Sequence, residues 1–412
     1  MSTNSPVPPH VCIVGGGFGG LYCALALQRY QRRSAPAFRI TLVEPRERFL
    51  FTPLLYEVLT DELKPWEIAP SYRELLRPST IAHCQDWVEH IDIPQQQVAL
   101  RRGEVLSYDY LVVATGSRLK PPATAGSHYA LPFTTLEDTW ALEKRLAELE
   151  ATATEVNPIH LVVAGAGPSG VELACKLADR LGRRGHITVL DRRAVILRSH
   201  SLAIQRAATK ALAKRGIEVF TDVDIEAVQA DQVIYQHADR THQRPADLVI
   251  WTVGTIPQPW LGVEIPKQSP LAQCLVMPTL QLLDYHNVFV LGDMAEMPAQ
   301  GQSRAPMTAQ AAYQAAPIVA HNLWASLHHR PLRPFHYHHM GNMLTLGKGE
   351  AVVHGLGLCL TGRLGAIARR WGYWLRLPTL HHRWRVLKHW LGLGGRGNSE
   401  VAHPPGIDAR KL

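Results

Sequence analysis

Two segments of the chain carry glycines at the spacing that binds the pyrophosphate of a dinucleotide. They are Gly15, Gly17 and Gly20 in the first segment and Gly165, Gly167 and Gly170 in the second. Glycines at these positions permit a sharp turn from strand to helix and let the backbone approach a pyrophosphate closely. The pyrophosphate then lies against the positive end of the helix. Each segment therefore predicts a site for one dinucleotide.

An acidic residue follows each glycine pattern at the distance needed to hold a ribose. Glu44 ends the segment FRITLVE, and Asp191 ends the segment HITVLD. A carboxylate about 20 residues beyond the glycines accepts hydrogen bonds from ribose hydroxyls. A structural glycine turn is the alternative for either segment alone, but two complete units in one chain argue against it. The pair predicts electron transfer between a bound flavin and a visiting nicotinamide.

Apolar strands that alternate with helices would position these residues. The segments DYLVVATGS and ADLVIWTVGT are typical of buried strands, and NVFVLGDMAE places Gly292 and Asp293 at the carboxyl end of another. Open α/β sheets bind ligands at that end. The pattern predicts an α/β fold with two Rossmann-like dinucleotide-binding domains, the second interrupting the first, and a C-terminal amphipathic helical region.

We expect four segments along the 412 residues. They are residues 1–120 and 271–350 as the two parts of the first dinucleotide-binding domain, 121–270 as the second dinucleotide-binding domain, and 351–412 as a basic amphipathic tail. The six cysteines form no CxxC pair, which is typical of thiols in a reducing compartment.

Four further motifs resemble those of the type II NAD(P)H:quinone oxidoreductases, flavoproteins with two dinucleotide-binding domains. They are FLFTPLLYEV at 49–58, ATGS at 114–117, LGD at 291–293 and AQAAYQ at 309–314. The resemblance implies a resident FAD, so that residues 1–120 and 271–350 form an FAD-binding domain whose second part includes a quinone-site helix. It implies NADH or NADPH as electron donor, bound by the NAD(P)H-binding domain at 121–270. It assigns to FAD the residues Gly15, Gly17, Gly20, Glu44, Thr115, Gly292 and Asp293. It assigns to the nicotinamide cofactor Gly165, Gly167, Gly170, Asp191, Arg192, Arg193 and Gly254.

Gln310 and Gln314 of the AQAAYQ motif are four residues apart, so they share one face of an otherwise apolar helix. Buried amides need partners, and either quinone carbonyls or neighbouring backbone groups would serve. The resemblance implies that this motif binds a quinone of the naphthoquinone, plastoquinone or ubiquinone type. It implies that hydride passes from the nicotinamide to the flavin and that two electrons and two protons then reach the quinone.

Glu172 lies two residues beyond the last glycine of the second pattern. Near a helix N-terminus a carboxylate is stabilised by the helix dipole, and this alone would explain a glutamate at position 172. The resemblance instead implies a glutamate at the junction of nicotinamide, flavin and quinone, where it aids hydride or proton transfer. No further acid–base pair is required, because the cofactor carries the redox chemistry.

The sequence leaves the choice between NADH and NADPH open. Asp191 would hold a ribose 2′-hydroxyl and repel a 2′-phosphate. Arg192 and Arg193 follow directly, however, and arginines there would clamp that phosphate. The length of the chain and this Asp-Arg-Arg ending are similar to the demethylphylloquinone reductase branch of the family, which acts in phylloquinone biosynthesis. A general respiratory-type dehydrogenase is the other interpretation.

The net charge of +8 is concentrated in a C-terminal region, since residues 351–399 contain no Asp or Glu. On a helical wheel one arc holds Leu364, Ile367, Trp371, Trp374 and Leu375, and the opposite side holds Arg363, Arg369, Arg370 and Arg376. Such helices bind membrane surfaces, so we expect residues 363–391 to contact anionic lipid. The enzyme would then be peripheral, on the cytoplasmic face of a thylakoid or plasma membrane. A helix pair that forms a homodimer contact or packs against another domain is the alternative use of this region.

Other function classes fit the residues less well. A sulfide:quinone oxidoreductase needs two cysteines beside the flavin, and Cys175 and Cys359 do not obviously suit that role. A flavin-binding NAD(P)H sensor or scaffold at a membrane would need no quinone turnover. No nucleic-acid-binding motif accompanies the basic charge. The 21 histidines form no HExxH pattern, so no metal site is expected.

Overall fold

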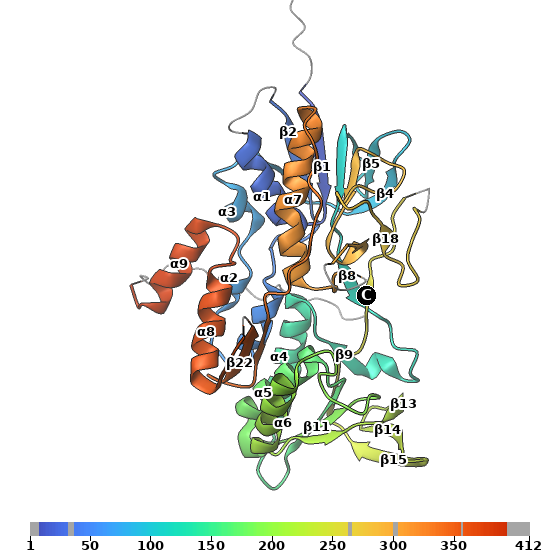
Figure 1. Ribbon diagram of the computed structural model, residues 1–412. Helices are drawn as coiled ribbons and strands as arrows, with labels where there is room; N and C mark the ends of the chain where they lie inside the picture. Colours follow the sequence, from blue (N-terminus) through green and yellow to red (C-terminus); the bar gives the residue numbers. More distant parts are fainter. Residues whose placement is uncertain (1–7, 32–36, 263–265, 300–303, 356, 394–412) are drawn as a thin grey trace, which may run out of the picture. The chain divides into compact units, whose positions relative to one another are not determined.

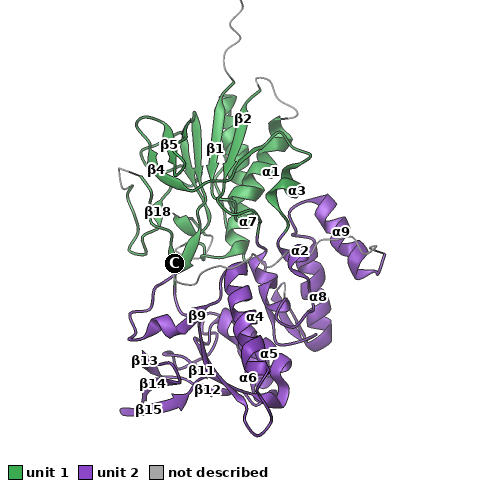
Figure 2. Cartoon of the chain, turned by 180° about the vertical axis from the view of Figure 1, so that it is seen from behind, with its two compact units in different colours: residues 1–49, 70–118, 255–339 green, residues 50–69, 119–254, 340–412 purple. Residues whose placement is uncertain are grey.

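The computed structural model describes residues 8–31, 37–262, 266–299, 304–355 and 357–393 (Figure 1). The chain forms two compact units, each assembled from separate stretches of sequence (Figure 2). Unit 1 comprises residues 1–49, 70–118 and 255–339, and unit 2 comprises residues 50–69, 119–254 and 340–412. Each unit contains one of the two glycine patterns.

Unit 1 is built on a five-stranded parallel sheet in the order β19-β7-β1-β2-β3. Its strands are β1 (His10–Val14), β2 (Arg39–Val43), β3 (Ala82–Cys84), β7 (Tyr110–Val113) and β19 (Val288–Val290). All five residues of β1 are buried, as expected for a central parallel strand covered on both faces. Helices α1 (Gly20–Gln31) and α7 (Ala309–Leu327) pack side by side in this unit (Figure 1).

Unit 2 contains a second five-stranded parallel sheet, in the order β12-β11-β10-β16-β9. Its strands are β9 (Ala130–Pro132), β10 (Ile159–Ala164), β11 (Gly185–Leu190), β12 (Glu218–Phe220) and β16 (Leu248–Trp251). The helices of this part are α4 (Leu136–Glu150), α5 (Pro168–Leu181) and α6 (Leu202–Lys214). In both sheets the strand before the glycine turn is central and the strand that ends in the acid is its neighbour.

The likeness of the two sheets extends to an insertion of three antiparallel strands in each. In unit 1 it consists of β4 (Val88–Asp92), β5 (Gln97–Leu100) and β6 (Val105–Ser107), between β3 and β7. In unit 2 it consists of β13 (Asp224–Val228), β14 (Gln232–His237) and β15 (Arg240–Pro245), between β12 and β16. The expectation of two Rossmann-like domains, the first interrupted by the second, is confirmed.

Unit 2 also holds the C-terminal region. The antiparallel strands β21 (Asn342–Thr345), β22 (Ala351–Gly355) and β23 (Leu358–Thr361) precede α8 (Gly362–Trp374) and α9 (Leu380–Trp390). Unit 2 also includes two short elements of the 50–69 segment, the 3₁₀ helix η1 (Thr52–Glu57) and helix α2 (Pro65–Ile68). None of the helices among the described residues is long and apolar enough to span a bilayer.

The remaining short elements connect these parts. They are α3 (Tyr72–Leu76), η2 (Ser127–Tyr129), η3 (Gly182–Arg184), η4 (Gly292–Met294), β8 (Ser117–Leu119), β17 (Thr255–Pro257), β18 (Cys274–Leu275) and β20 (Ala295–Glu296).

The unit boundaries differ from the four segments expected from the sequence. Residues 50–69 and 340–412 belong to unit 2, because η1 packs on α5 and β22 packs on α6 and α8. Residues 255–270 belong to unit 1.

Candidate active site

The first glycine turn follows β1 closely. Gly15 has φ +96°, and its N–H donates to Val43 O at 2.9 Å. A Cβ on Gly20 would lie 1.8 Å from Gly15 O, so only glycine lets α1 start there. A Cβ on Gly17 would meet nothing within 4 Å. The turn thus leaves open space at Gly17, where the pyrophosphate of a dinucleotide would approach.

The second turn repeats this geometry residue for residue. Gly165 has φ +106° and donates to Leu190 O at 2.7 Å. A Cβ on Gly170 would again lie 1.8 Å from the carbonyl oxygen of the first glycine, and Gly167 again faces open space. Both turns therefore fit a dinucleotide, which is the chemistry that the spacing predicts.

The two predicted ribose-binding acids also occupy equivalent places. Glu44 Oε2 accepts from Gly16 N at 2.7 Å, and Asp191 Oδ2 accepts from Ala166 N at 2.5 Å. The second carboxylate oxygen in each accepts the backbone N–H two residues further on, at 3.1 Å for Glu44 and 2.7 Å for Asp191. Each acid is therefore fixed beside its own glycine turn.

Tyr72 is a residue of the first site that the sequence did not suggest. It lies on α3, is buried, and donates its hydroxyl to Gly16 O at 2.8 Å. A Cβ on Gly16 would lie 2.3 Å from that hydroxyl, so the tyrosine packs directly on the turn. A tyrosine in a segment remote from the glycines gives no sequence signal for such a contact.

Asp293 closes the opposite side of the first site. Its Oδ2 accepts from Ser117 Oγ at 2.5 Å, and burial raises its pKa although this bond lowers it. Gly292 has φ +72° in the same short turn, η4. Thr115 lies two residues before Ser117 in the loop after β7, half-buried. Unit 1 therefore brings together the carboxyl ends of β1, β7 and β19, where an open α/β sheet binds its ligand.

Helix α7 begins beside this turn, since η4 and the first residues of α7 are in contact. Gln310 and Gln314 are half-buried on it rather than fully buried. Gln310 Oε1 accepts from the Tyr337 hydroxyl at 2.7 Å. Gln314 bonds the backbone of His338 through both ends of its amide, at 2.8 Å and 3.1 Å. The two glutamines, equivalent in the sequence pattern, have different partners.

Glu172 lies on α5 in unit 2 and is buried. Its Oε1 accepts from Thr345 N at 2.8 Å and from Arg369 Nη2 at 3.4 Å. Burial raises its pKa to about 7, although Arg369 and the Thr345 bond lower it. A carboxyl with this pKa exchanges protons near neutral pH, which suits a general acid or base.

Arg369 overturns part of the interpretation of the basic tail. The sequence pattern placed it on a polar face of the helix, but it is buried, with Gly365 and Tyr373 on the same inner face of α8. Positions four apart share one helix face, and the carboxylates of Glu57 and Glu172 inside unit 2 need a cation. Arg369 Nη1 binds Glu57, and Arg369 Nη2 donates to Pro53 O at 2.6 Å.

The predicted nicotinamide residues outside the glycine turn are more exposed. Arg192 and Arg193 are exposed beside Asp191, in the loop after β11. Gly254, with φ +81°, is exposed after β16 and accepts from Lys120 N through its carbonyl at 3.0 Å. Both guanidinium groups are therefore accessible to a ligand that binds from solvent beside Asp191.

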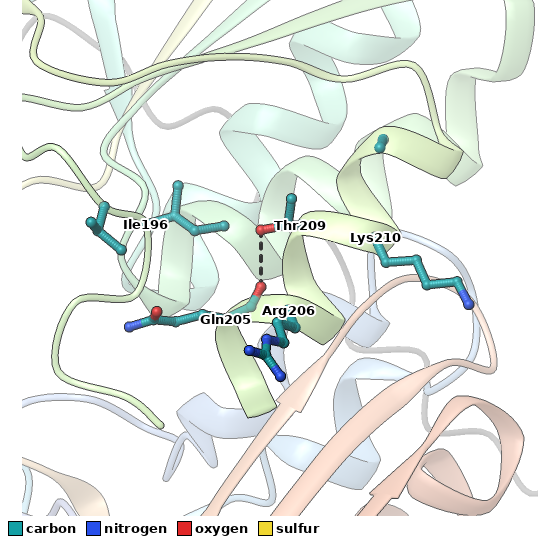
Figure 3. A pocket seen from close by; sticks show the side chains of 7 residues that line it. Ile196, Gln205, Arg206, Thr209 and Lys210 are labelled. Atoms are coloured by element: carbon teal, nitrogen blue, oxygen red, sulfur yellow. Dashed lines mark hydrogen bonds between the residues drawn. The ribbon is translucent and has the colours of Figure 1, made fainter. Parts of the chain in front are cut away.

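A separate shallow hollow of about 430 Å³ lies along the outer side of α6 (Figure 3). Ile196, Arg206 and Lys210 line it, and the Thr209 hydroxyl there donates to Gln205 O at 3.0 Å. No residue predicted from the sequence lines this hollow.

Comparisons with known proteins agree with this geometry. The model of the pyridine nucleotide-disulphide oxidoreductase family matches residues 9–316. The demethylphylloquinone reductase of Synechocystis sp. is 40% identical over 388 residues, which cover 93% of this chain and 96% of that protein. The alternative NAD(P)H-ubiquinone oxidoreductase C1 of Arabidopsis thaliana is 34% identical, over 93% of this chain and 80% of that protein.

The chain belongs to the type II NAD(P)H:quinone oxidoreductases. As a member of this family it is a flavin-dependent oxidoreductase. The structure of NDH2 from Plasmodium falciparum in complex with NADH superposes with a TM-score of 0.80 at 17% identity, covering 94% of this chain and 99% of that one. At that identity the likeness concerns the fold. The resemblance drawn from the motifs is thus confirmed.

The cysteines of this type II oxidoreductase are not arranged for thiol chemistry. All six are free, and four are buried. Burial raises the pKa of Cys175 to about 12, so its thiol stays protonated near neutral pH. Cys359 is exposed on β23. Within the described ranges no group of three or more histidine, cysteine or acidic side chains could hold a metal ion.

Proposed function

We propose that this chain is an NAD(P)H:quinone oxidoreductase in which unit 1 holds FAD and unit 2 binds the nicotinamide cofactor. The observation that carries this assignment is the pair of matched glycine turns, each with its own fixed acid, on two five-stranded parallel sheets. FAD, when bound, supplies the capacity to accept a hydride and to release two electrons. The protein binds and orients the cofactors and the quinone, and its side chains donate and accept protons.

The residues of the first site fit FAD in this assignment. Gly15, Gly17 and Gly20 receive the pyrophosphate, and Glu44 receives the adenosine ribose. On the other side Thr115, Gly292 and Asp293 face the flavin end. The open space at Gly17 and the buried carboxylate of Glu44 support this arrangement. Gly165, Gly167, Gly170, Asp191, Arg192, Arg193 and Gly254 have the same task for NADH or NADPH.

We assign proton exchange to Glu172 and quinone binding to the N-terminal turns of α7. Gln310 is the stronger candidate for the quinone carbonyl. Tyr337 donates to its Oε1, so a side chain and not the backbone orients this amide, and a quinone carbonyl accepts hydrogen bonds from amide N–H groups. Gln314 holds the His338 backbone instead. The preferred acceptor is a naphthoquinone, because the Synechocystis relative is named a demethylphylloquinone reductase.

An anionic membrane surface is the proposed partner of α8 and α9. Leu364, Ile367, Trp371 and Leu375 on α8 are exposed large apolar side chains, as are Leu380 and Trp384 on α9. Arg363, Arg370 and Lys388 are exposed beside them, and residues 351–399 contain no acid to repel lipid phosphate. An apolar face flanked by cations fits the interface of an anionic bilayer on its cytoplasmic side. A membrane partner also fits an electron acceptor that is a lipid-soluble quinone.

Anaerobic half-reactions test the assignment. NADH and NADPH are mixed separately with the oxidised protein, and bleaching of the flavin absorbance is followed by stopped flow. The reduced protein is then mixed with naphthoquinone, plastoquinone and ubiquinone analogues of equal chain length. We expect fast bleaching and fastest reoxidation by the naphthoquinone. Bleaching without reoxidation by any quinone would leave an NAD(P)H sensor as the function, and bleaching by sulfide would indicate a sulfide oxidase.

A further inference from the structure

Five charged side chains form a continuous buried cluster in unit 2. Arg369 contacts both Glu57 and Glu172, and Lys176 contacts both Glu57 and Glu62. The pairs are Arg369–Glu57, Arg369–Glu172 at 3.4 Å, Lys176–Glu57 at 3.9 Å and Lys176–Glu62. They come from α8, η1, α5 and the turn that follows η1. Glu172 and Lys176 are one helical turn apart on α5, which aligns them on one face.

Only one end of the cluster reaches solvent. The side chains of Lys176, Arg369, Glu57 and Glu172 are each less than 10% exposed, whereas that of Glu62 is 21% exposed. Glu62 is held at this outer end by Gly349 N at 2.9 Å and by the Thr60 hydroxyl at 2.6 Å. The cluster therefore leads from solvent at Glu62 to Glu172 in the interior.

The charges of the cluster do not balance unless one carboxyl carries a proton. Three carboxylates and two cations give a net charge of −1 when all are ionised, and a buried unbalanced charge is costly. The groups packed against Glu172 are Arg369, Glu57, Lys176, Tyr56 and Tyr373. Burial raises the pKa of Glu172 to about 7, whereas Lys176, Thr60 and Gly349 together outweigh burial and lower that of Glu62. These opposite shifts favour a proton on Glu172 over one on Glu62.

Glu57 lies between Lys176 and Arg369 in the cluster, and one of its two carboxylate oxygens is available to carry a proton. Its Oε1 binds Arg369 and Lys176, whereas its Oε2 has no hydrogen-bond partner among the described residues. Arg369 itself cannot carry a proton, because a guanidinium does not deprotonate in proteins. An ammonium group can, so Lys176 and the three carboxyls are the groups able to pass one along.

We propose that Glu62, Lys176 and Glu57 form a proton path from solvent to Glu172, and that Arg369 is the positioning residue that keeps Glu57 and Glu172 together. The proposal rests on the proposed function and deepens it. The overall reaction, NAD(P)H + H⁺ + quinone → NAD(P)⁺ + hydroquinone, takes one proton from solvent. The hydride supplies the other hydrogen and both electrons.

The steps balance within the cluster. Lys176 gives one N–H proton to Glu57, whose O–H then reprotonates the Glu172 carboxylate after it has given up its proton. Glu62, a carboxylate in the resting cluster, then takes up one proton from water and passes it to neutral Lys176. Each step breaks one N–H or O–H bond and forms another, and the cluster returns to its starting charge. One solvent proton has then reached Glu172.

The substitution Lys176→Arg separates a proton path from a structural ion pair. Arginine keeps the positive charge between Glu57 and Glu62 but does not release a proton. We expect flavin bleaching by NAD(P)H at the wild-type rate, reoxidation by quinone slowed by about tenfold or more, and a larger solvent isotope effect on reoxidation. Glu62→Gln, which removes the outer carboxyl, is expected to act in the same direction.

Glu143→Gln is the matched control. Glu143 is also a half-buried carboxylate paired with a cation of α5, Arg180, at 2.6 Å, but it lies outside the cluster. It should leave both half-reactions and the isotope effect at wild-type values. Flavin content and thermal midpoint of all variants identify any that fail to fold.

A second readout does not depend on quinone turnover. Difference infrared spectra between pH 6 and pH 8 should contain a protonated carboxyl band that Glu172→Gln removes, and Lys176→Arg should slow its hydrogen–deuterium exchange. Wild-type exchange and reoxidation rates in folded Lys176→Arg would overturn the path, as would an equal loss of both half-reactions. Failure of wild-type protein to be reoxidised by any quinone would instead refute the proposed function, and the exchange measurement would still decide on the path.

Discussion

Gln314 clamps His338 by both ends of its amide: Nε2 donates to His338 O at 2.8 Å, and Oε1 accepts from His338 N at 3.1 Å. This pair of bonds ties the segment after the last turn of α7 back to the first turns of the same helix. Gln310, one turn earlier, has a side-chain partner in Tyr337 instead. The glutamines that the motif presents as a pair therefore have separate tasks.

The first prediction follows from this difference. Gln310→Ala removes the amide assigned to the quinone and should raise the KM for a short-chain naphthoquinone by about tenfold, equivalent to ~1.4 kcal/mol. Gln314→Ala leaves two backbone groups of His338 without partners and should lower the thermal midpoint by a few degrees. Steady-state kinetics and thermal unfolding of both variants test the assignment. Equal effects of the two substitutions on KM would contradict it.

The second prediction concerns the glycine turns. Gly167→Ala adds a Cβ in open space at φ −73°, so the protein should fold with normal stability and keep its flavin. The KM for NAD(P)H should nevertheless rise tenfold or more, because the Cβ occupies the space where a pyrophosphate would approach. Gly17→Ala is the counterpart in unit 1 and should release FAD without altering nicotinamide binding. Titrations of both cofactors decide, and loss of FAD in Gly167→Ala would argue against the division of the sites.

The sequence predicts the two nucleotide units because their constraints are local. Gly15 with Gly20, or Gly165 with Gly170, must meet within a single strand–turn–helix, and an acid at the end of the next strand is a short distance along the chain. Contacts such as Tyr72 on Gly16 and Arg369 on Glu172 join segments tens to hundreds of residues apart, and no periodicity records them. Lys176 is visible in the sequence, since it and Glu172 are the two charged residues of the otherwise apolar helix segment VELACKLA.

Arg369 shows why a helical wheel alone misplaced a charge. The wheel put Arg369 on the basic side of the helix with Arg363, Arg370 and Arg376. The acids that attract Arg369 are Glu57 and Glu172, far outside that segment, so only the tertiary structure identifies the inner face of α8. Most of the predicted apolar arc is exposed, namely Leu364, Ile367, Trp371 and Leu375. Trp374 is instead half-buried and donates to Arg383 O at 2.8 Å.

The third prediction addresses the choice of nicotinamide cofactor. Asp191 is fixed by Ala166 N and Arg193 N, so its negative charge cannot swing away from a 2′-phosphate. Asp191→Ser should raise the ratio of kcat/KM for NADPH to that for NADH by about tenfold, because repulsion disappears while the arginines remain. Glu44→Gln, the equivalent position of unit 1, is the control and should leave the ratio unchanged. A ratio unaffected by Asp191→Ser would place discrimination elsewhere.

The fourth prediction is a pH dependence of stability. The folded state raises the pKa of Glu172 from 4.5 to about 7, so between these values it binds more protons than the unfolded state. This group's contribution to the unfolding free energy is therefore full below pH 4.5 and falls as pH rises toward 7, by about 1.4 kcal/mol per pH unit at most. Glu172→Gln should flatten the fall of the thermal midpoint across this window. Exposed Glu148→Gln should reproduce the wild-type curve, and a parallel curve for Glu172→Gln would contradict the buried, proton-binding role.

The fifth prediction tests the membrane face, for which a deletion is unsuitable. Removing the chain from Gly362 onward would also remove Arg369 and leave Glu57 and Glu172 without their cation. Substituting serine at Leu364, Ile367 and Trp371 avoids this, because these side chains are 68%, 55% and 46% exposed and lie on the side of α8 away from Arg369.

The triple variant should lose sedimentation with vesicles containing anionic lipid while it keeps turnover of a short-chain, water-soluble quinone. Each of these side chains contributes apolar area to the interface, and their removal leaves electrostatic attraction alone, which added salt screens. Leu202→Ser, at an exposed leucine of α6, is the control and should bind vesicles as the wild type does. Unchanged vesicle binding by the triple variant, with a dimer in the wild type that becomes a monomer in the variant, would instead assign this face to a second copy of the chain.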